Sequence, residues 1–377
     1  MPDGGVVTRQ DVEDFARGTD FLSASGGGAP VESTEQMLDD VERGVALNWV
    51  DLDSIADDDL VVSTFYSGSI APESFDTTDV ERAAGVERTV GRPVVEAVRE
   101  LERYLGVEFG AVISVEIGGL NTGLALDAAA NLGKPMLDAD YAGRAIPEAQ
   151  CVTPAMFGES IAPMACVDYY GDITIIHRAV NNTMAERLGK FVAISSFGTV
   201  GCAGIPLRGE IVKRIAVPGT LSESLQIGRA IREAREAGDD PVEALAERVP
   251  NTALLLRGRV ADRSWENRDG YMWGEHLIEG ENGFAGKSLL VWFKNENHLS
   301  WLDNEPFVAS PDIIEFVDSD TGEPRANTDL AVGDRIAVFG VRRRPQFDSP
   351  AGLAALGPAH WGFDFEFRPI EQLVAAR

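Results

Sequence analysis

Apolar and polar residues alternate along the first half of the chain with two different periods. Residues 92–106 carry apolar side chains every three or four positions, including Val94 and Val98, which predicts an amphipathic helix. Residues 59–66 and 110–119 are short and mostly apolar, which is typical of strands covered on both faces of a sheet. Because strand-like and helical segments alternate along the chain, the pattern predicts βαβ units in a largely parallel sheet.

Caps and stop signals place further helices. Thr8 precedes a segment with acidic residues in its first turn, so a helix is predicted to begin there. Residues 120–133 predict a helix of small residues that ends at Gly133, because glycine readily adopts the left-handed conformation found at helix ends. In the second half, residues 218–249 predict two helices, the first of them capped by Thr220 or Ser222.

The pattern changes near residue 170, where residues 165–179 predict a hairpin. From residue 251 the chain consists of short strands separated by turn signals, which predicts a sandwich- or barrel-like module. A chain of 377 residues is also long for a single core. We therefore predict two domains, an N-terminal α/β domain with a largely parallel sheet and an α+β C-terminal domain. Their expected ranges are 1–170 and 171–377, the latter with a helical part at about 181–250 and a β-rich part at about 251–377.

The charge balance is strongly acidic. The chain has 33 basic and 61 acidic residues, a net charge of −28, and only five of the basic residues are lysines. The acidic residues are spread along the chain, which favours a cytoplasm of high salt, where self-repulsion is screened, over a cationic partner. We find no basic face that could bind a phosphate backbone, so nucleic acid is excluded as a ligand.

The apolar runs and the cysteines indicate where in the cell the protein is expected and which cross-links it is expected to lack. No apolar run approaches the ~20 residues that span a bilayer, and MPDGGVVTRQ does not have the pattern of a signal peptide, so we expect a cytoplasmic protein without a membrane partner. Cys151, Cys166 and Cys202 are odd in number and widely spaced, which predicts neither a disulfide framework nor a structural zinc site. Cys202 follows glycines and could be a nucleophile, but a small buried residue is the favoured interpretation.

Acidic side chains follow two neighbouring strands of the predicted sheet. Glu116 lies at the end of the strand at 110–119, and Asp138 and Asp140 end the next strand. Because the carboxyl ends of parallel strands meet at one edge, where such sheets bind ligands, three carboxylates are expected to converge. We predict Glu116 and Asp138 as catalytic bases or metal ligands, although Asp138 could instead cap a loop, and Asp140 as either a third catalytic acid or a solvated surface acid.

The same edge has residues suited to binding a small substrate. Gly118, Gly119 and Asn121 follow Glu116, and Arg144 and Glu148 lie just beyond Asp140. Glycines let a substrate approach the backbone, and arginine offers a planar fork for a carboxylate, although Arg144 could instead pair with Glu148.

A glycine-rich loop and an asparagine complete the predicted binding residues. Gly26, Gly27 and Gly28 separate two helical segments, and their backbone N–H groups could bind a carboxylate or a ring carbonyl, or simply reverse the chain. Asn181 could orient a polar ring, although helix capping at Asn182 or Thr183 is the favoured interpretation of this segment.

The four histidines do not lie at a metal-binding spacing. None occurs in an H-x-H or H-E-x-x-H pattern, so no histidine-based zinc centre is predicted. A lone histidine is more often a structural residue, and of the four, His276 and His298, which lie near tryptophan and asparagine residues, are the better candidates for the site.

Several segments, taken in order, resemble one family, the S-methyl thiohydantoin desulfurases. The segments are SGGGAP, VEIGGLN, DADYAGRAIPE, NNTMAERLGK, VPGTLSESLQIGRAIREA, FKNENHL, SPDIIEFVDSDTGEP, GDRIAVFG and GFDFEFRPIE. The resemblance implies an N-terminal and a C-terminal domain. It also implies removal of the sulfur substituent from a thiohydantoin during breakdown of sulfur-containing histidine derivatives. This chain departs from the family pattern at SSFGTVGCAGIPLRG and at His298.

The resemblance, together with the predicted site, implies hydrolysis of a small cyclic amide-like ring. Glu116 or Asp138 would activate water, directly or through a divalent metal, and Arg144 would bind a substrate carboxylate. A second hypothesis is a non-catalytic subunit of a hydantoinase- or oxoprolinase-like complex, since the genes of the family often accompany such enzymes. A nucleotide-binding α/β protein is a third. The chain could also form a homo-oligomer.

Overall fold

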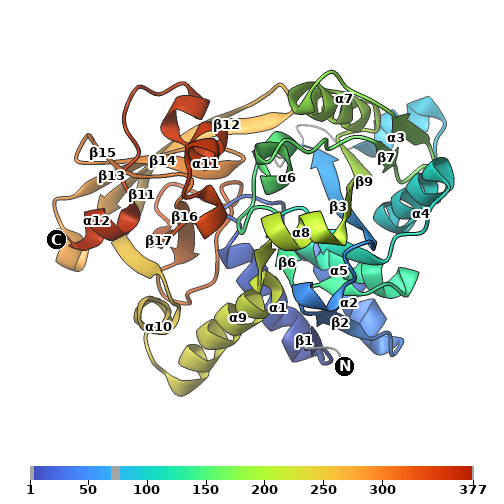
Figure 1. The fold of residues 1–377 in the computed structure, drawn as a ribbon. Coiled ribbons are helices and arrows are strands. Elements are labelled where there is room, and N and C mark those ends of the chain that lie inside the picture. The colour runs from blue at the N-terminus through green and yellow to red at the C-terminus, as the bar shows by residue number, and fades with distance from the viewer. Residues whose placement is uncertain (1–3, 69–76, 376–377) are drawn as a thin grey trace.

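The computed structural model describes residues 4–68 and 77–375, and the side chains of 77–80 are outside this description. Figure 1 shows two units side by side, a sheet covered by helices and a second, antiparallel sheet. The predicted fold class is therefore confirmed: an α/β unit with parallel strands is followed by a β-rich unit.

Within the described residues the first sheet has eight strands, four of which run parallel at its centre. In spatial order the strands are β1 (Gly4–Val6), β2 (Leu47–Val50), β5 (Met136–Leu137), β4 (Ala111–Ser114), β3 (Leu60–Gly68), β9 (Thr199–Arg208), β7 (Met164–Val167) and β8 (Ile173–Ile176). The hairpin predicted near residue 170 is formed by β7 and β8. β9 comes later in the chain and pairs antiparallel with β3 and β7, so the sheet continues beyond residue 170.

Helices cover both faces of this sheet because its strands carry apolar side chains on both sides. Val62 and Val112 face α4 and α5, whereas Val61 and Ile113 face the other way, toward α7 and α8. The helices are α1 (Arg9–Phe21), α2 (Val31–Glu42), α3 (Thr77–Ala84), α4 (Pro93–Leu105), α5 (Asn121–Leu132), α6 (Thr153–Met156), α7 (Asn182–Ser195), α8 (Gly209–Ile215), α9 (Thr220–Ala237), α10 (Pro241–Arg248), α11 (Pro350–Leu356) and α12 (Ile370–Ala375).

Most of the predicted helix ends are confirmed. Thr8 caps α1 with a reciprocal hydrogen-bond pair to Asp11, and Gly133 ends α5 in the left-handed conformation. The predicted cap of α9 is wrong, because the residue before the helix is Gly219 and neither Thr220 nor Ser222 caps it with its side chain.

The second sheet is antiparallel and has seven strands in the part of the chain that the structure describes. In spatial order they are β15 (Glu305–Ala309), β14 (Glu296–Leu302), β13 (Ser288–Lys294), β12 (Tyr271–Gly280), β11 (Thr252–Arg268), β17 (Arg335–Val341) and β16 (Ile313–Asp318). β16 also contacts β14 and β15, so the sheet curls into a half-barrel. A separate two-stranded sheet pairs β6 (Ala139–Asp140) with β10 (Val217–Pro218). Short 3-10 helices are η1 (Leu52–Ser54), η2 (Ala149–Cys151), η3 (Asn282–Phe284), η4 (Pro345–Phe347) and η5 (Pro358–Trp361).

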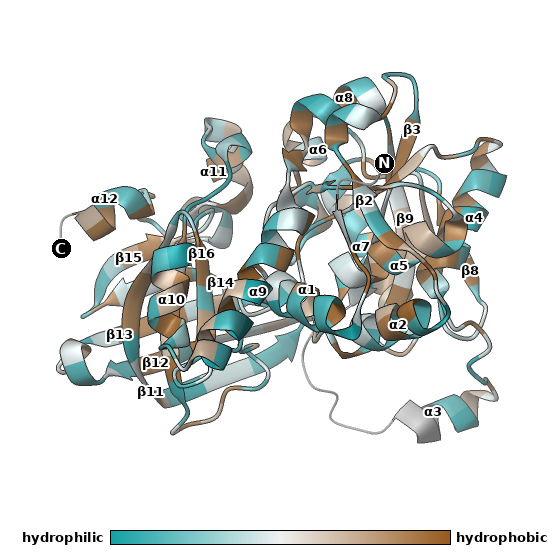
Figure 2. Ribbon diagram, turned by 90° about the horizontal axis from the view of Figure 1, so that it is seen from below, coloured by the Kyte–Doolittle hydropathy of each residue, from teal (hydrophilic) through white to brown (hydrophobic). Residues whose placement is uncertain are grey.

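α1 and α9 lie between the two units and join them (Figures 1 and 2). The two helices cross so closely that a Cβ atom on Gly18 or Gly228 would overlap a backbone oxygen of the other helix. One core cluster includes residues of both units, and the Phe21 and Phe339 rings meet edge to face at 5.8 Å. The two units therefore share one apolar core, and this packing fixes the geometry of any site that lies between them. Across the described ranges, no helix is both long and apolar enough to cross a bilayer.

Candidate functional site

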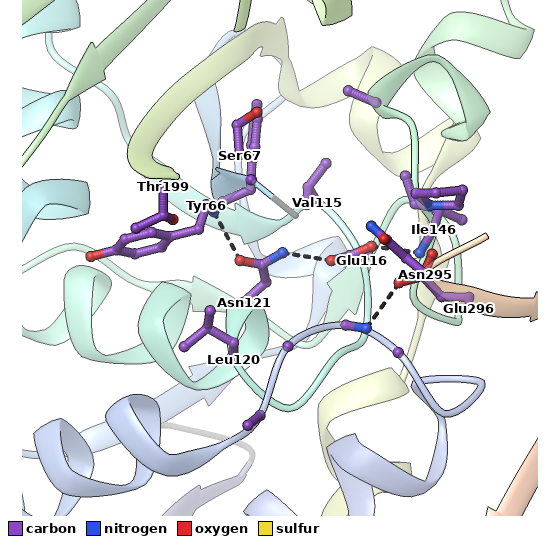
Figure 3. A pocket seen from close by; sticks show the side chains of 18 of the residues that line it. Tyr66, Ser67, Val115, Glu116, Leu120, Asn121, Ile146, Thr199, Asn295 and Glu296 are labelled. Atoms are coloured by element: carbon purple, nitrogen blue, oxygen red, sulfur yellow. Dashed lines mark hydrogen bonds between the residues drawn. The ribbon is translucent and has the colours of Figure 1, made fainter. Parts of the chain in front are cut away.

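A cavity of about 430 Å³ lies between the two units. Glu116 after β4 and Asn121 at the start of α5 line it from the first unit, and Asn295 and Glu296 line it from the second (Figure 3). The loop of Gly26 and its neighbours forms another wall. A volume in this range suits a single-ring ligand with a substituent.

Glu116 is buried, and neighbours hold both of its carboxyl oxygens. Its Oε1 accepts a hydrogen bond of 2.5 Å from Asn121 Nδ2, and its Oε2 accepts one of 2.7 Å from Ile146 N (Figure 3). Asn121 is oriented in turn by Tyr66, whose N–H donates to Asn121 Oδ1 at 2.8 Å. Burial raises the pKa of Glu116 to about 7, although the two donors favour its ionised form. This carboxyl therefore exchanges protons near neutral pH.

Glu296 is a second buried carboxyl in the cavity, and sequence reasoning missed it. Its Oε1 accepts a hydrogen bond of 2.9 Å from Gly27 N, whereas its Oε2 has no hydrogen-bond partner among the described residues. Burial and the charge of Glu116 raise the pKa of Glu296 to about 8. The segment FKNENHL contains Glu296, but nothing in the local pattern joins it to the glycine loop 269 residues away. Glu116 accepts two hydrogen bonds from neighbouring donors and Glu296 only one, so of the two acids Glu296 holds its proton more strongly.

The glycines of the two loops pack against each other. Gly26, Gly27 and Gly28 line the cavity, whereas Gly118 and Gly119 lie behind them. A Cβ atom on Gly118 would lie 3.2 Å from Gly27 Cα, and one on Gly26 would lie 2.5 Å from Glu296 Oε1. The absence of side chains thus brings the glycine loop close to Glu116 and Glu296. The N–H of Gly27 binds Glu296, so it orients an acid of the site.

Asp138 and Asp140 do not line the cavity. Asp138 Oδ1 accepts hydrogen bonds from Leu221 N and Ser222 N at 2.9 and 3.1 Å, so this aspartate caps α9 from a distant part of the chain. Asp140 is buried, and its Oδ2 accepts from Ala142 N and Gly143 N at 2.8 and 2.6 Å. Burial raises the pKa of Asp140 to about 7. The three strand-end acids therefore point to three different places.

Arg144 and Asn181 also lie away from the cavity lining. The buried guanidinium of Arg144 donates to the carbonyl oxygens of Ala145, Asp312 and Asn297 at 2.8 to 3.2 Å, which ties the two units together. Burial lowers the pKa of Arg144 to about 10. Asn181 is exposed and caps α7 through a hydrogen bond from Met184 N, so the expected cap at Asn182 or Thr183 is wrong by one or two residues.

Glu148 belongs to a second cluster, next to the cavity. Its Oε2 lies 3.3 Å from His360 Nε2 and 4.0 Å from Cys151 Sγ, and its Oε1 pairs with the Lys294 ammonium. Burial works to raise the pKa of Glu148, but His360 and Lys294 outweigh it and lower the pKa to about 2. The cluster offers one carboxylate, one thiol and one imidazole to a metal ion. None of its three residues lines the cavity.

His276 and His298 are buried among aromatic rings. His276 stacks on Phe293 at 4.9 Å, and His298 lies 3.9 Å from the Trp361 ring. Burial lowers the pKa of His276 to about 4, so this ring stays neutral. Cys202 is also buried, as favoured from the sequence, with its Sγ 3.5 Å from that of Cys166.

Comparison with known families identifies the chain. The model of the S-Me-THD-like N-terminal domain matches residues 10–178, and that of the S-Me-THD-like C-terminal domain matches residues 180–370. The chain belongs to the S-methyl thiohydantoin desulfurase family. A solved structure of a protein from Chromobacterium violaceum has the same fold, with a TM-score of 0.76 at 21% sequence identity over 96% of this chain and 99% of that one. No curated protein matches the chain.

Family membership points to a thiohydantoin-related enzyme, and the cavity is the part of this member best suited to one. It holds two acids whose pKa values lie near neutrality and near each other. Two such groups can move protons in opposite directions during one reaction.

Proposed function

We propose that this enzyme hydrolyses an S-methyl thiohydantoin to the corresponding hydantoin with release of methanethiol. The observation that carries the proposal is the pair of buried carboxyls, Glu116 and Glu296, in one cavity of single-ring size. Two donors hold the carboxyl of Glu116 and one holds that of Glu296, which favours the ionised form at Glu116 and the protonated form at Glu296.

In the first step, the Glu116 carboxylate removes a proton from water as the water oxygen bonds to the ring carbon that bears sulfur. The electron pair of the C=N bond moves to the ring nitrogen, which takes the proton of Glu296. Glu296 is suited to this donation because its Oε2 has no other hydrogen-bond partner among the described residues. The step yields a tetrahedral carbon that carries both OH and SCH₃.

In the second step, the Glu296 carboxylate takes the proton of the OH group as the carbonyl forms. The C–S bond breaks, and the methanethiolate that leaves takes the proton held by Glu116. Both acids return to their starting states, so one water is consumed and one thiol is released per turnover. The steps use only side chains and water.

The test is thiol release from a panel of S-methyl thiohydantoins by the purified chain. Glu116→Gln and Glu296→Gln are each expected to lower kcat by about 10²- to 10⁴-fold, the usual contribution of a positioned acid or base. Asp140→Asn is the matched control, since Asp140 is also buried with a pKa of about 7 but lies outside the cavity, and it is expected to stay active.

Two results would contradict the proposal. Near-normal turnover by either glutamine variant, with folding intact, would remove the assigned roles. Absence of thiol release from every substrate by the wild-type chain would instead favour the alternative, a non-catalytic subunit of a hydantoinase- or oxoprolinase-like complex.

A further inference from the structure

Two short 3-10 turns from distant parts of the chain place three metal-binding side chains together. Glu148 precedes η2 and Cys151 ends it, and residues three apart lie on the same side of a 3-10 helix. The Cys151 N–H donates to the Glu148 carbonyl at 2.8 Å, which closes this turn. His360 comes from η5, more than 200 residues later, and its Nε2 faces both side chains.

The three ligand atoms form a triangle of the size found around a tetrahedral zinc ion. Their separations are 3.3 Å from His360 Nε2 to Glu148 Oε2, 3.8 Å from His360 Nε2 to Cys151 Sγ, and 4.0 Å from Cys151 Sγ to Glu148 Oε2. Usual zinc–ligand lengths and tetrahedral angles require about 3.4 to 3.6 Å between such atoms. The side chains therefore need to move by only a few tenths of an ångström to bind the ion.

We propose that Glu148, Cys151 and His360 bind a zinc ion, with a water molecule as the fourth ligand. A thiolate and a carboxylate would neutralise the two charges of the ion, and the mixed sulfur, nitrogen and oxygen set is one that zinc accepts. The side chains of His360 and Glu148 remain 21% and 14% exposed, which leaves access for the water.

Neighbouring residues already orient the carboxylate for this role. Lys294 binds Glu148 Oε1, whereas Oε2 is the oxygen near Cys151 and His360 and accepts a hydrogen bond of 2.8 Å from Gln150 Nε2. Hydrogen bonds of this kind to ligating carboxylates are common in metal sites, where they hold the ligand in place. Glu148 would thus bind the ion through Oε2 alone while Lys294 fixes its other oxygen.

The zinc ion would join the C-terminal segment to the loop that positions the cavity acids. Ile146, two residues before Glu148, donates to Glu116, and the N–H of Ala149 donates to Glu186 in the cavity wall. With His360 bound to the same ion, η5 would hold this loop in place. The proposal concerns residues outside the cavity and stands independently of the reaction proposed above.

Metal analysis of the full chain, purified without chelators, tests the proposal directly. We expect about one zinc per chain in the wild-type protein, and at least a tenfold loss of bound zinc in Cys151→Ser and His360→Ala. Removal of zinc by a chelator should lower Tm, and added zinc should restore it. Cys202→Ser and His177→Gln are the matched controls, since they remove another buried cysteine and another histidine, and both should keep the ion.

Cobalt substitution keeps the test decisive if the variants do not fold. Wild-type protein loaded with Co²⁺ should show the absorption band of a cobalt–thiolate bond, because Cys151 supplies the sulfur. A wild-type protein that stays far below one metal per chain after dialysis against zinc would overturn the proposal. So would a cobalt-loaded protein without the thiolate band, or triad variants that retain zinc as well as the controls do.

Discussion

Replacing Asn121 by leucine should move the acid limb of the pH–activity profile upward. In the wild-type enzyme, activity is expected to rise with pH as Glu116 ionises around pH 7, and to fall as Glu296 loses its proton around pH 8. Asn121 Nδ2 donates to Glu116 Oε1 at 2.5 Å, and this hydrogen bond favours the ionised form. Leucine has a similar volume but no donor, so the charged carboxylate loses one of its two partners.

The size of the shift follows from the strength of that contact. A hydrogen bond to a charged group stabilises a protein by about 1.5–3 kcal/mol. One pKa unit corresponds to about 1.4 kcal/mol, so the pKa of Glu116 should rise by roughly one to two units. The acid limb would then overlap the basic limb, and the maximum would become lower and move toward higher pH.

The assay is the pH dependence of kcat/KM for thiol release, which reports ionisations of the free enzyme. The position of the acid limb is the readout, since its height also depends on substrate contacts. Asn131→Leu is the matched control, because the Asn131 amide also donates to carboxylates, those of Asp40 and Asp127, but lies outside the cavity. An acid limb that stays in place in folded Asn121→Leu would refute the assignment of Glu116 as the ionising base.

Three further predictions concern stability. The pKa of Glu296 is raised to about 8 in the folded state, so the contribution of this residue to stability falls as pH rises from about 4.5 to 8. The Tm of Glu296→Gln, measured relative to wild type, should therefore rise over that pH range. The relative Tm of the control Glu279→Gln should not change, because Glu279 is exposed. Asp138→Ala removes the cap of α9 and should lower the free energy of unfolding by about 1 kcal/mol in urea titrations. Asp138→Asn keeps an acceptor, so its free energy of unfolding should fall by less. An inactive Asp138→Asn variant would contradict the capping role. Raising KCl from about 0.1 M to 1 M shortens the screening length from about 10 Å to 3 Å. Because this screens the self-repulsion of a chain with a net charge of −28, Tm should rise. A constant Tm would contradict the prediction that the protein is adapted to high salt.

Local sequence patterns predicted most of the elements that surround the site. α4 has the apolar stripe of an amphipathic helix, and β3 and β4 are apolar on both faces, because helices cover both sides of their sheet. Thr8 and Gly133 also act within a few residues of their own position. The α9 cap was mispredicted for the opposite reason: its acceptor, Asp138, comes from more than 80 residues earlier.

The sequence by itself determined the βαβ elements and the residues that follow their strands, because hydrophobic periodicity and helix caps depend on near neighbours. This reasoning led to Glu116, Asn121 and the glycine loop, which the structure places in one cavity. Only the tertiary structure decided which acids meet. It brought Glu296 to the glycine loop and His360 to Glu148, and it directed Asp138 to a helix cap. Contacts across more than 200 residues depend on how two sheets pack, and no local spacing encodes them.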